Sequence, residues 1–417
     1  MKHLFRPEYE KYWVLSDQAA VSGGAFITNL ALAKLLGIFA YGSFSAVWLA
    51  QMFFLSITMS FSSQIYQVVF PKLNDQEKMM LTTGMLAQQV FTGIMLILLV
   101  SLLNMGFPAL FATHLGIQGN FAGFWPILAI VLFLIQDFLR RTFCTRGEAR
   151  IAFLIDMLDN GLQVILLLVT WVLHIVSLRN AWAIVAIAYI PGLIIGIYKL
   201  QLSPSIASSL KFTFSLQRNK TGWLLGSSLL QWGAGYFFVF AAGWWIGVTA
   251  LGALRLAQYL FGCINLLLQA IENYTLPHAS SKVQARDYWL RLTTKCALII
   301  APLLILLTVL ARPIISLAGG SDFAPFAYVI YGLTITYIII TLGYPVRIAI
   351  RSLQMNREYF TAYVLSVGVS LTTAPWLLQH WQLFGVFTGL LMAQLINTGY
   401  WLFALYRKKM FIWKSIT

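Results

Sequence analysis

Residues 16–45, SDQAAVSGGAFITNLALAKLLGIFAYGSFS, are the stretch from which the fold of this chain is predicted. Their pattern of glycine and aromatic residues returns 210 residues later, at 226–255, without a gap. The matched pairs are Gly23 with Gly233, Phe26 with Tyr236, Gly37 with Gly247, Gly42 with Gly252, and, further on, Arg141 with Arg351 and Glu148 with Glu358. Such a repeat in a membrane protein is typical of two similar helical bundles that face each other across a central site.

The composition places the whole chain in a membrane. Of 417 residues, 59% are hydrophobic and only 10% are charged, whereas a soluble domain carries about 25% charged residues. Apolar runs of about 18–27 residues recur, each long enough to cross the hydrocarbon core as a helix. We therefore predict an all-α polytopic membrane protein with about twelve transmembrane helices. The expected spans lie near 14–36, 44–70, 79–103, 121–138, 151–176, 182–200, 223–246, 252–276, 292–311, 326–346, 359–378 and 385–405.

The basic residues orient these spans. The net charge is +15, and if both termini are cytoplasmic, 24 of the 28 Lys and Arg residues fall on the inner side. This bias is the positive-inside rule, so the charge predicts orientation and contact with anionic lipids, and it argues against a nucleic-acid partner. The expected location is a bacterial inner membrane, with both termini in the cytoplasm. The inner segments 139–150 and 347–358 are expected to be cytoplasmic loops that contact lipid headgroups.

The longest polar stretch on the inner side divides the chain into two lobes. Residues 201–222 are rich in Ser and basic residues and are expected to form an amphipathic cytoplasmic linker. The predicted domains are a six-helix lobe at 1–200, this linker, and a second six-helix lobe at 223–417. The two lobes would be pseudo-symmetric and enclose a central cavity.

Polar residues lie along one face of several predicted spans. Because such side chains are costly in hydrocarbon, we expect them to face protein or water and to line the cavity. The candidates, from span one to span eight, are Asp17, Gln64, Gln67, Asp156, Asp159, Asn160, Gln163, Gln231, Gln269, Glu272 and Asn273. Two cations inside predicted spans complete the set, Lys34 and Arg255.

Structural roles compete with cavity roles for these charged residues. Asp156 and Asp159 also suit an interaction with the dipole at the start of their helix, and Asp17 also suits a helix cap. Glu272 would alternatively pair with a neighbouring Lys or Arg. Lys34 is expected to extend its side chain to the membrane interface, whereas Arg255 also suits a phosphate or sugar-acid ligand.

Enzymatic chemistry finds little support in the sequence. The three cysteines and five histidines are scattered, with no metal-ligand or triad spacing, and there is no phosphate-binding glycine loop. We therefore expect no catalytic residues, no metal and no cofactor.

The stretch at 16–45 and the segment QIYQVVFPKL at 64–73 resemble bacterial polysaccharide flippases, a branch of the multidrug/oligosaccharidyl-lipid/polysaccharide exporter superfamily. The resemblance implies flipping of an oligosaccharide on an undecaprenyl-diphosphate type carrier, from the cytoplasmic to the periplasmic leaflet, by alternating access, for surface polysaccharide biosynthesis. It also implies other polysaccharide-assembly membrane proteins as partners.

Two alternative functions remain at this stage. One is a proton- or sodium-coupled multidrug exporter of the same superfamily, in which Asp17 and Asp156 or Asp159 respond to the coupling ion. The other, from a different class, is a membrane-embedded glycan-modifying enzyme, which the absence of a large outer loop disfavours.

Overall fold

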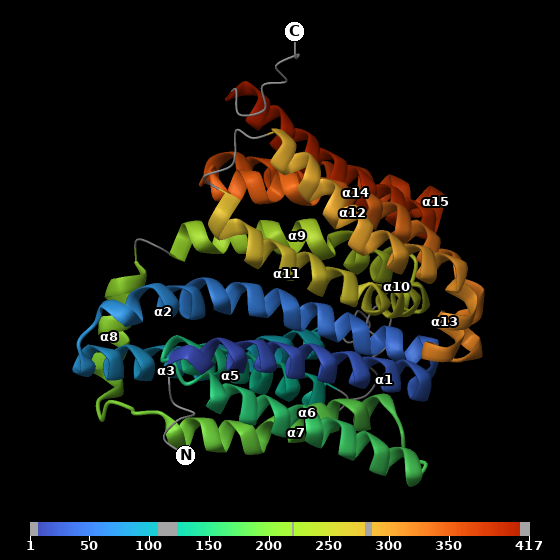
Figure 1. Cartoon of the computed structure of the whole chain (residues 1–417). Coiled ribbons are helices and arrows are strands. Elements are labelled where there is room, and N and C mark those ends of the chain that lie inside the picture. Colours follow the sequence, from blue (N-terminus) through green and yellow to red (C-terminus); the bar gives the residue numbers. More distant parts are fainter. Residues whose placement is uncertain (1–6, 107–122, 219–220, 280–285, 409–417) are drawn as a thin grey trace. The chain divides into compact units, whose positions relative to one another are not determined.

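The computed structural model describes residues 7–106, 123–218, 221–279 and 286–408, and in these ranges all regular secondary structure is helical (Figure 1). The chain forms two compact units, Met1–Leu229 and Leu230–Thr417. Each is described by itself below.

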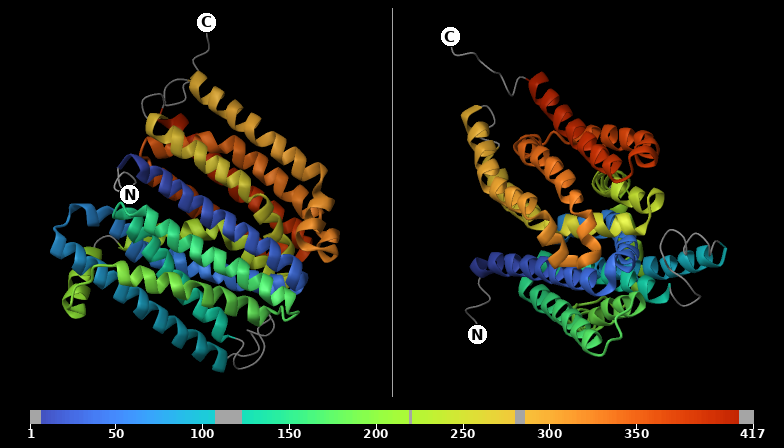
Figure 2. Two further views of the ribbon diagram at one scale, coloured as in Figure 1. Left: turned by 60° about the horizontal axis from the view of Figure 1, so that its bottom comes forward. Right: turned by 90° about the vertical axis from the view of Figure 1, so that its right-hand side faces the viewer.

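Unit 1 is a bundle in which α1 packs against α6, α5 against α7, and α6 against both α5 and α7. These helices run side by side in Figure 1 and in both views of Figure 2. The helices are α1 (Pro7–Thr58), α2 (Gln64–Val69), α3 (Asp75–Gly106), α5 (Phe124–Thr145), α6 (Ala149–Val172), α7 (Leu178–Lys199) and α8 (Ile206–Gln217). A π-helical turn, Met59–Ser63, joins α1 to α2, and a 3₁₀ turn, Phe70–Lys72, follows α2.

Unit 2 is built around α14, which packs against α10, α11, α12 and α15. Its helices are α10 (Val248–Leu260), α11 (Gly262–Ala279), α12 (Arg286–Val309), α13 (Ala311–Gly319), α14 (Tyr328–Ser352) and α15 (Asn356–Arg407), with a 3₁₀ segment at Ser321–Phe326. Helix α9 (Thr221–Trp245) contains the division between the two units.

The helices account for twelve membrane crossings in the part of the chain that the structure describes. Eight helical segments are long and apolar enough to cross a membrane. Two of them, of 61 and 52 residues, are too long for one crossing at about 1.5 Å per residue, and each has non-helical backbone in its interior, so each counts twice. The bent pair α10–α11 adds one crossing. Helix α5 is not among the eight segments, but its 22 residues are long enough to span about 30 Å, and counting it gives twelve. This count confirms the predicted all-α polytopic fold.

The two interior breaks differ from the loops expected from the sequence. Helix α1 turns at Gly37, where φ is 73° and ψ is 170°, and helix α15 turns at Gln382, where φ is 46°. Gly247, the repeat partner of Gly37, has a similar backbone conformation, with φ 123° and ψ 167°, and precedes α10. The repeat therefore preserves the joint between the first and second helices of each half.

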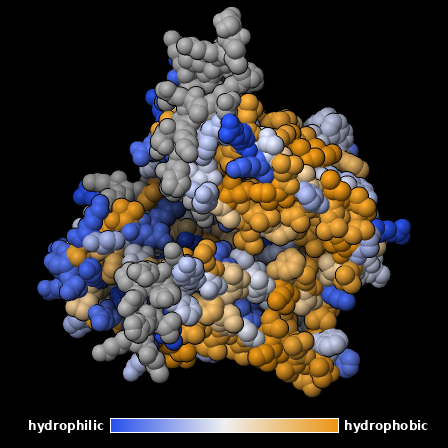
Figure 3. All heavy atoms as spheres, viewed as in Figure 1, coloured by the Kyte–Doolittle hydropathy of each residue, from blue (hydrophilic) through white to orange (hydrophobic). Residues whose placement is uncertain are grey.

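The exposed side chains are those of a protein in lipid. Many large apolar residues on the helices are exposed, among them Leu102, Val172 and Val309. On the face shown in Figure 3, hydrophobic side chains form large continuous areas, and hydrophilic ones gather at the side where α8 lies in Figure 1. Apolar areas of this extent are costly in water but stable against lipid. The chain is a multi-pass membrane protein.

The predicted linker contains an ordered helix that is part of unit 1. Helix α8 packs against α3 and buries Ser209, Thr213 and Gln217. Gln217 exchanges two side-chain hydrogen bonds with Gln88 of α3, at 2.8 and 2.7 Å. Its amide also donates to the carbonyl of Phe61, in the π-helical turn.

Candidate functional site

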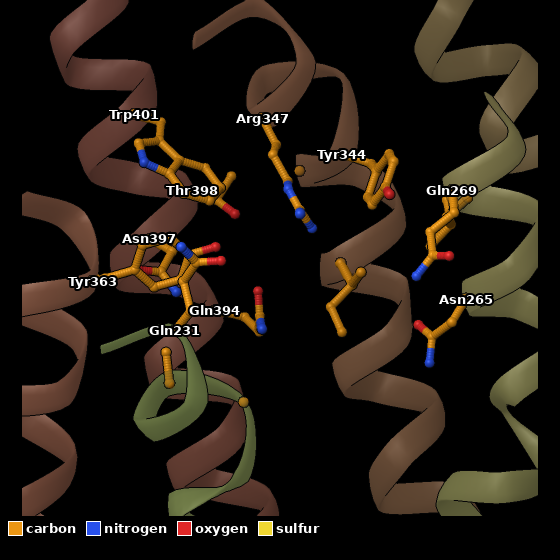
Figure 4. A pocket seen from close by; sticks show the side chains of 15 residues that line it. Gln231, Asn265, Gln269, Tyr344, Arg347, Tyr363, Gln394, Asn397, Thr398 and Trp401 are labelled. Carbon is orange, nitrogen blue, oxygen red and sulfur yellow. The ribbon is translucent and has the colours of Figure 1, made fainter. Parts of the chain in front are cut away.

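A polar cavity of about 250 Å³ lies inside unit 2. Its walls come from α9, α11, α14 and both halves of α15, so it is surrounded by membrane-spanning helices (Figure 4). The side chains that line it are mainly amides, aromatic rings and one arginine. They include Gln231, Asn265, Gln269, Tyr344, Arg347, Tyr363, Gln394, Asn397, Thr398 and Trp401.

Of the sequence candidates whose side chains are described, Gln231 and Gln269 line this cavity. In Figure 4 the amides of Asn265 and Gln269 extend into it from α11, and those of Gln394 and Asn397 lie across from them on α15. Asn265 also donates to the hydroxyl of Tyr337, at 2.8 Å. The opposed amides offer both donors and acceptors to one space.

Arg347 occupies a different place from the one that the sequence predicts. The segment 347–358 was expected to be a cytoplasmic loop, but Arg347 belongs to α14 and lines the cavity. Its guanidinium lies 5.4 Å from the centre of the Tyr344 ring. The offset of 210 pairs it with Asp137, which is also on a helix. The repeat therefore indicates a helical position for Arg347, whereas the positive-inside pattern indicates a loop.

Glu272 is held by two partners at the edge of this cavity. It is buried on α11, pairs with Arg351 of α14, and accepts a hydrogen bond of 2.7 Å from the hydroxyl of Tyr344. The ion-pairing role that the sequence left open is therefore present, and the carboxylate neutralises Arg351.

A second cluster of charges lies inside unit 1. The guanidinium of Arg140, on α5, is 3.9 Å from a carboxylate oxygen of Asp17, on α1, and 3.9 Å from one of Asp156, on α6. Gln136 donates to Asp156 at 3.2 Å. Arg140 was expected in a cytoplasmic loop, but it is in α5 and its side chain is only 18% exposed.

The other polar residues of α6 pack against neighbouring helices of unit 1. Asp159 is buried with its carboxylate against Gly192 of α7, and Gln163 is buried one turn further on. Asn160 donates to the backbone of Asp156 and occupies the space beside Gly24 of α1. This stripe lies at the contacts of α6 with α1 and α7 and is not part of the cavity in unit 2.

The remaining sequence candidates with described side chains do not line the cavity in unit 2. Arg255 is buried on α10, donates to Gln258 at 2.7 Å and lies 4.9 Å from the centre of the Tyr259 ring. Lys34 is exposed on α1, as the interface interpretation requires. Gln64 is half-buried and Gln67 is exposed, both on α2. The side chain of Asn273 lies outside the described residues.

No group of three or more His, Cys, Asp or Glu side chains in the described ranges lies close enough together to hold a metal ion.

Known structures identify the class to which this arrangement of helices belongs. No family model and no curated protein matches the chain. Among solved structures, an inward-facing multidrug resistance MATE family transporter of the MOP superfamily matches 97% of this chain and 96% of its own, at 15% identity and a TM-score of 0.65. The chain therefore has the fold of these polytopic membrane transporters.

Two further structures have the same fold. The lipid II flippase MurJ, in an inward closed conformation, matches 96% of this chain and 89% of its own at 15% identity, with a TM-score of 0.67. A MOP superfamily transporter from Pyrococcus furiosus matches 96% of each chain at 14% identity, with a TM-score of 0.60. A lipid flippase and drug transporters thus share this architecture, so the substrate must be argued from the site.

Proposed function

We propose that the chain is a transporter that flips a lipid-diphosphate-linked oligosaccharide from the cytoplasmic to the periplasmic leaflet of a bacterial inner membrane, for surface polysaccharide biosynthesis. The single observation that carries the proposal is the chemistry of the cavity in unit 2: five amides, aromatic rings and one arginine, with no carboxylate among the lining residues in the described part of the chain.

This chemistry suits a sugar. Each side-chain amide both donates and accepts hydrogen bonds, as sugar hydroxyl groups do, and flat aromatic rings pack against the apolar faces of sugar rings. Arg347 adds a positive charge that favours an anionic substrate. A cavity for cationic drugs would instead be expected to present carboxylates or a mostly apolar surface.

The physical task of such a protein is to move a polar headgroup across hydrocarbon while the lipid tail stays in the bilayer. A polar cavity within membrane-spanning helices lowers the barrier, because the headgroup keeps hydrogen-bond partners throughout. Alternating access then exposes the site to one leaflet and next to the other. In this proposal no covalent chemistry is needed, so the chain is not an enzyme.

A coupled drug exporter is the second candidate, and Asp159 is the observation that favours it. Asp159 is buried, and no ion pair involves it among the described residues, so it would suit a proton or sodium ion. Asp17 and Asp156 suit that role less well, because Arg140 already compensates their charge.

The deciding experiment is mass spectrometry of lipid-linked sugars in cells depleted of this protein, combined with a membrane-impermeant glycan reagent. We expect one diphosphate-linked oligosaccharide to accumulate on the cytoplasmic leaflet while surface polysaccharide is lost. An unchanged lipid-linked pool with intact surface glycan would refute the flippase. Loss of drug resistance in Asp159→Asn cells, with normal surface glycan, would establish the exporter instead.

A further inference from the structure

We infer that the cavity in unit 2 binds an acidic sugar, a hydroxylated ring that carries a single anionic group, with Arg347, Asn397 and Trp401 as the residues that recognise it. The inference rests on the proposed function and specifies its substrate class. In this inference the cavity binds the sugar, and the carrier diphosphate binds elsewhere.

The first argument is that three buried polar atoms of this cavity have no hydrogen-bond partner within the protein. They are Nε of Arg347, Oδ1 of Asn397 and Nε1 of Trp401. Asn397 is 2% exposed and Trp401 is 5% exposed. Buried polar groups in folded proteins are nearly always satisfied, and those that are not call for an explanation such as a ligand.

The second argument is the type of these atoms. Arg347 and Trp401 each leave an N–H donor unused, and Asn397 leaves an acceptor unused. Two donors suit the oxygens of a carboxylate or a phosphate group, and the acceptor suits a hydroxyl group that donates. An acidic sugar carries both kinds of group on one ring. Figure 4 shows the Arg347 and Asn397 side chains extending into the same cavity.

The third argument is the charge balance. Arg347 is the only charged residue among the lining residues that the structure describes, and the neighbouring Arg351 is neutralised by Glu272. One uncompensated cation matches one anionic group, a carboxylate or a single phosphate, whereas a carrier diphosphate brings two adjacent phosphate groups. The cavity therefore suits a uronate-type carboxylate or a sugar phosphate better than the diphosphate.

The fourth argument is the aromatic wall. The Trp401 ring stacks on Tyr359, with ring centres 5.4 Å apart and planes 2° from parallel, and it meets Tyr363 edge-on. These contacts fix the indole, and the hydroxyls of Tyr359 and Tyr363 lie 3.1 Å apart and fix each other. A rigid indole with a free N–H is a suitable surface for a sugar ring.

The test measures binding to the purified full-length chain in lipid nanodiscs by saturation-transfer NMR. The probes are D-glucuronate, glucose 6-phosphate, glucose and inorganic pyrophosphate. We expect at least one of the two acidic sugars to bind at least tenfold more tightly than glucose, and the preferred one identifies the anionic group. In Arg347→Gln this preference should fall at least tenfold.

Matched variants separate recognition from folding. Trp401→Phe keeps a ring but removes the N–H, and it should weaken binding of the acidic sugar severalfold. Arg407→Gln removes the same charge from an exposed position at the end of α15 and should leave binding unchanged. Equal binding of glucose and both acidic sugars to the wild type would overturn the inference. So would tighter, Arg347-dependent binding of pyrophosphate, which would assign the cavity to the carrier.

Complementation of depleted cells distinguishes this inference from the proposed function. If the wild-type gene restores surface glycan and Arg347→Gln restores it equally, the acidic-sugar inference fails and the flippase stands. If depletion leaves the lipid-linked pool unchanged, the flippase fails, and the binding data alone decide whether the cavity takes an acidic sugar.

Discussion

At the scale of single residues, Arg140 compensates the negative charge of two buried carboxylates in unit 1. Asp17 and Asp156 are 3% and 4% exposed, and the Arg140 guanidinium lies between them on a third helix. A buried charge is strongly unfavourable without a partner, so removing one member of such a cluster costs more than the cluster contributes. Arg140 therefore connects α1, α5 and α6 electrostatically.

We predict that Arg140→Gln destabilises the protein by about 3–5 kcal/mol, because it leaves two buried carboxylates without a cation. Adding Asp156→Asn to Arg140→Gln should recover part of the loss. Thermal unfolding of the purified variants in detergent measures both effects. Arg141→Gln is the matched control, since its partner Asp137 is on the same helix and a single pair is broken. Equal losses in the two single variants would contradict the prediction.

At the scale of helices, the joint at Gly37 depends on the residue type. Its φ of 73° with ψ of 170° is a conformation that essentially only glycine adopts, and Gly247 is in the same region. Both glycines let the chain leave one helix and enter the next without an intervening loop. Glycine therefore recurs at an offset of 210 because both positions require a backbone conformation that other residues rarely adopt.

We predict that Gly37→Ala and Gly247→Ala each destabilise the fold by about 1–3 kcal/mol, since a Cβ strains this backbone conformation. The control is Gly23→Ala, inside helix α1, where nothing lies within 4 Å of an added Cβ. Alanine there should be neutral or stabilising, because it favours helix. Melting temperatures of the three variants test this, and a loss in Gly23→Ala as large as in Gly37→Ala would count against it.

Helix α8 illustrates how a polar segment is held in place by hydrogen bonds. Gln217 bonds to Gln88 of α3 and to the carbonyl of Phe61 in the π-helical turn. We predict that Gln217→Ala weakens the docking of α8 by about 1–3 kcal/mol, since Gln88 is left buried and unpaired. Trypsin should then cleave faster after Lys211. Ser215→Ala, at an exposed position, should leave the rate of tryptic cleavage unchanged. A cleavage rate unaffected by Gln217→Ala would show that other contacts hold α8 in place.

At the scale of the whole molecule, the distribution of basic residues and the helix count lead to one topology. The twelve spans expected from the sequence return the chain to the side where it began, and 24 of 28 Lys and Arg residues fall on that side if it is the cytoplasm. Orientation in the membrane is thus a testable expectation of the sequence.

We predict that a fluorescent protein fused after residue 408 folds and fluoresces in bacterial cells, and that alkaline phosphatase fused there is inactive, because the positive-inside rule predicts a cytoplasmic C-terminus. Alkaline phosphatase fused after residue 177, between α6 and α7, should be active. The opposite pattern at the two sites would reverse the orientation.

The sequence by itself determined the class of fold, because hydrophobic length and the 210-residue repeat are local and periodic signals. It also identified Gln231 and Gln269 as cavity residues, because amides on apolar helices are costly unless they face water or protein. A cavity role for the polar residues of α6 stays a prediction. The stripe of α6, Asp156 to Gln163, has the same period as a cavity face but packs against α1 and α7.

Only the tertiary structure decided which charges are compensated. Arg140 and Arg347 both follow apolar runs and resemble cytoplasmic loop residues in the sequence, yet each lies within a helix, Arg140 between two carboxylates and Arg347 in the cavity. Charge compensation joins residues more than 100 positions apart, such as Asp17 and Arg140, and no periodic pattern records such a pairing. The physical reason is that the free energy of a charge in a membrane depends on what lies beside it in space, and helix packing alone determines that.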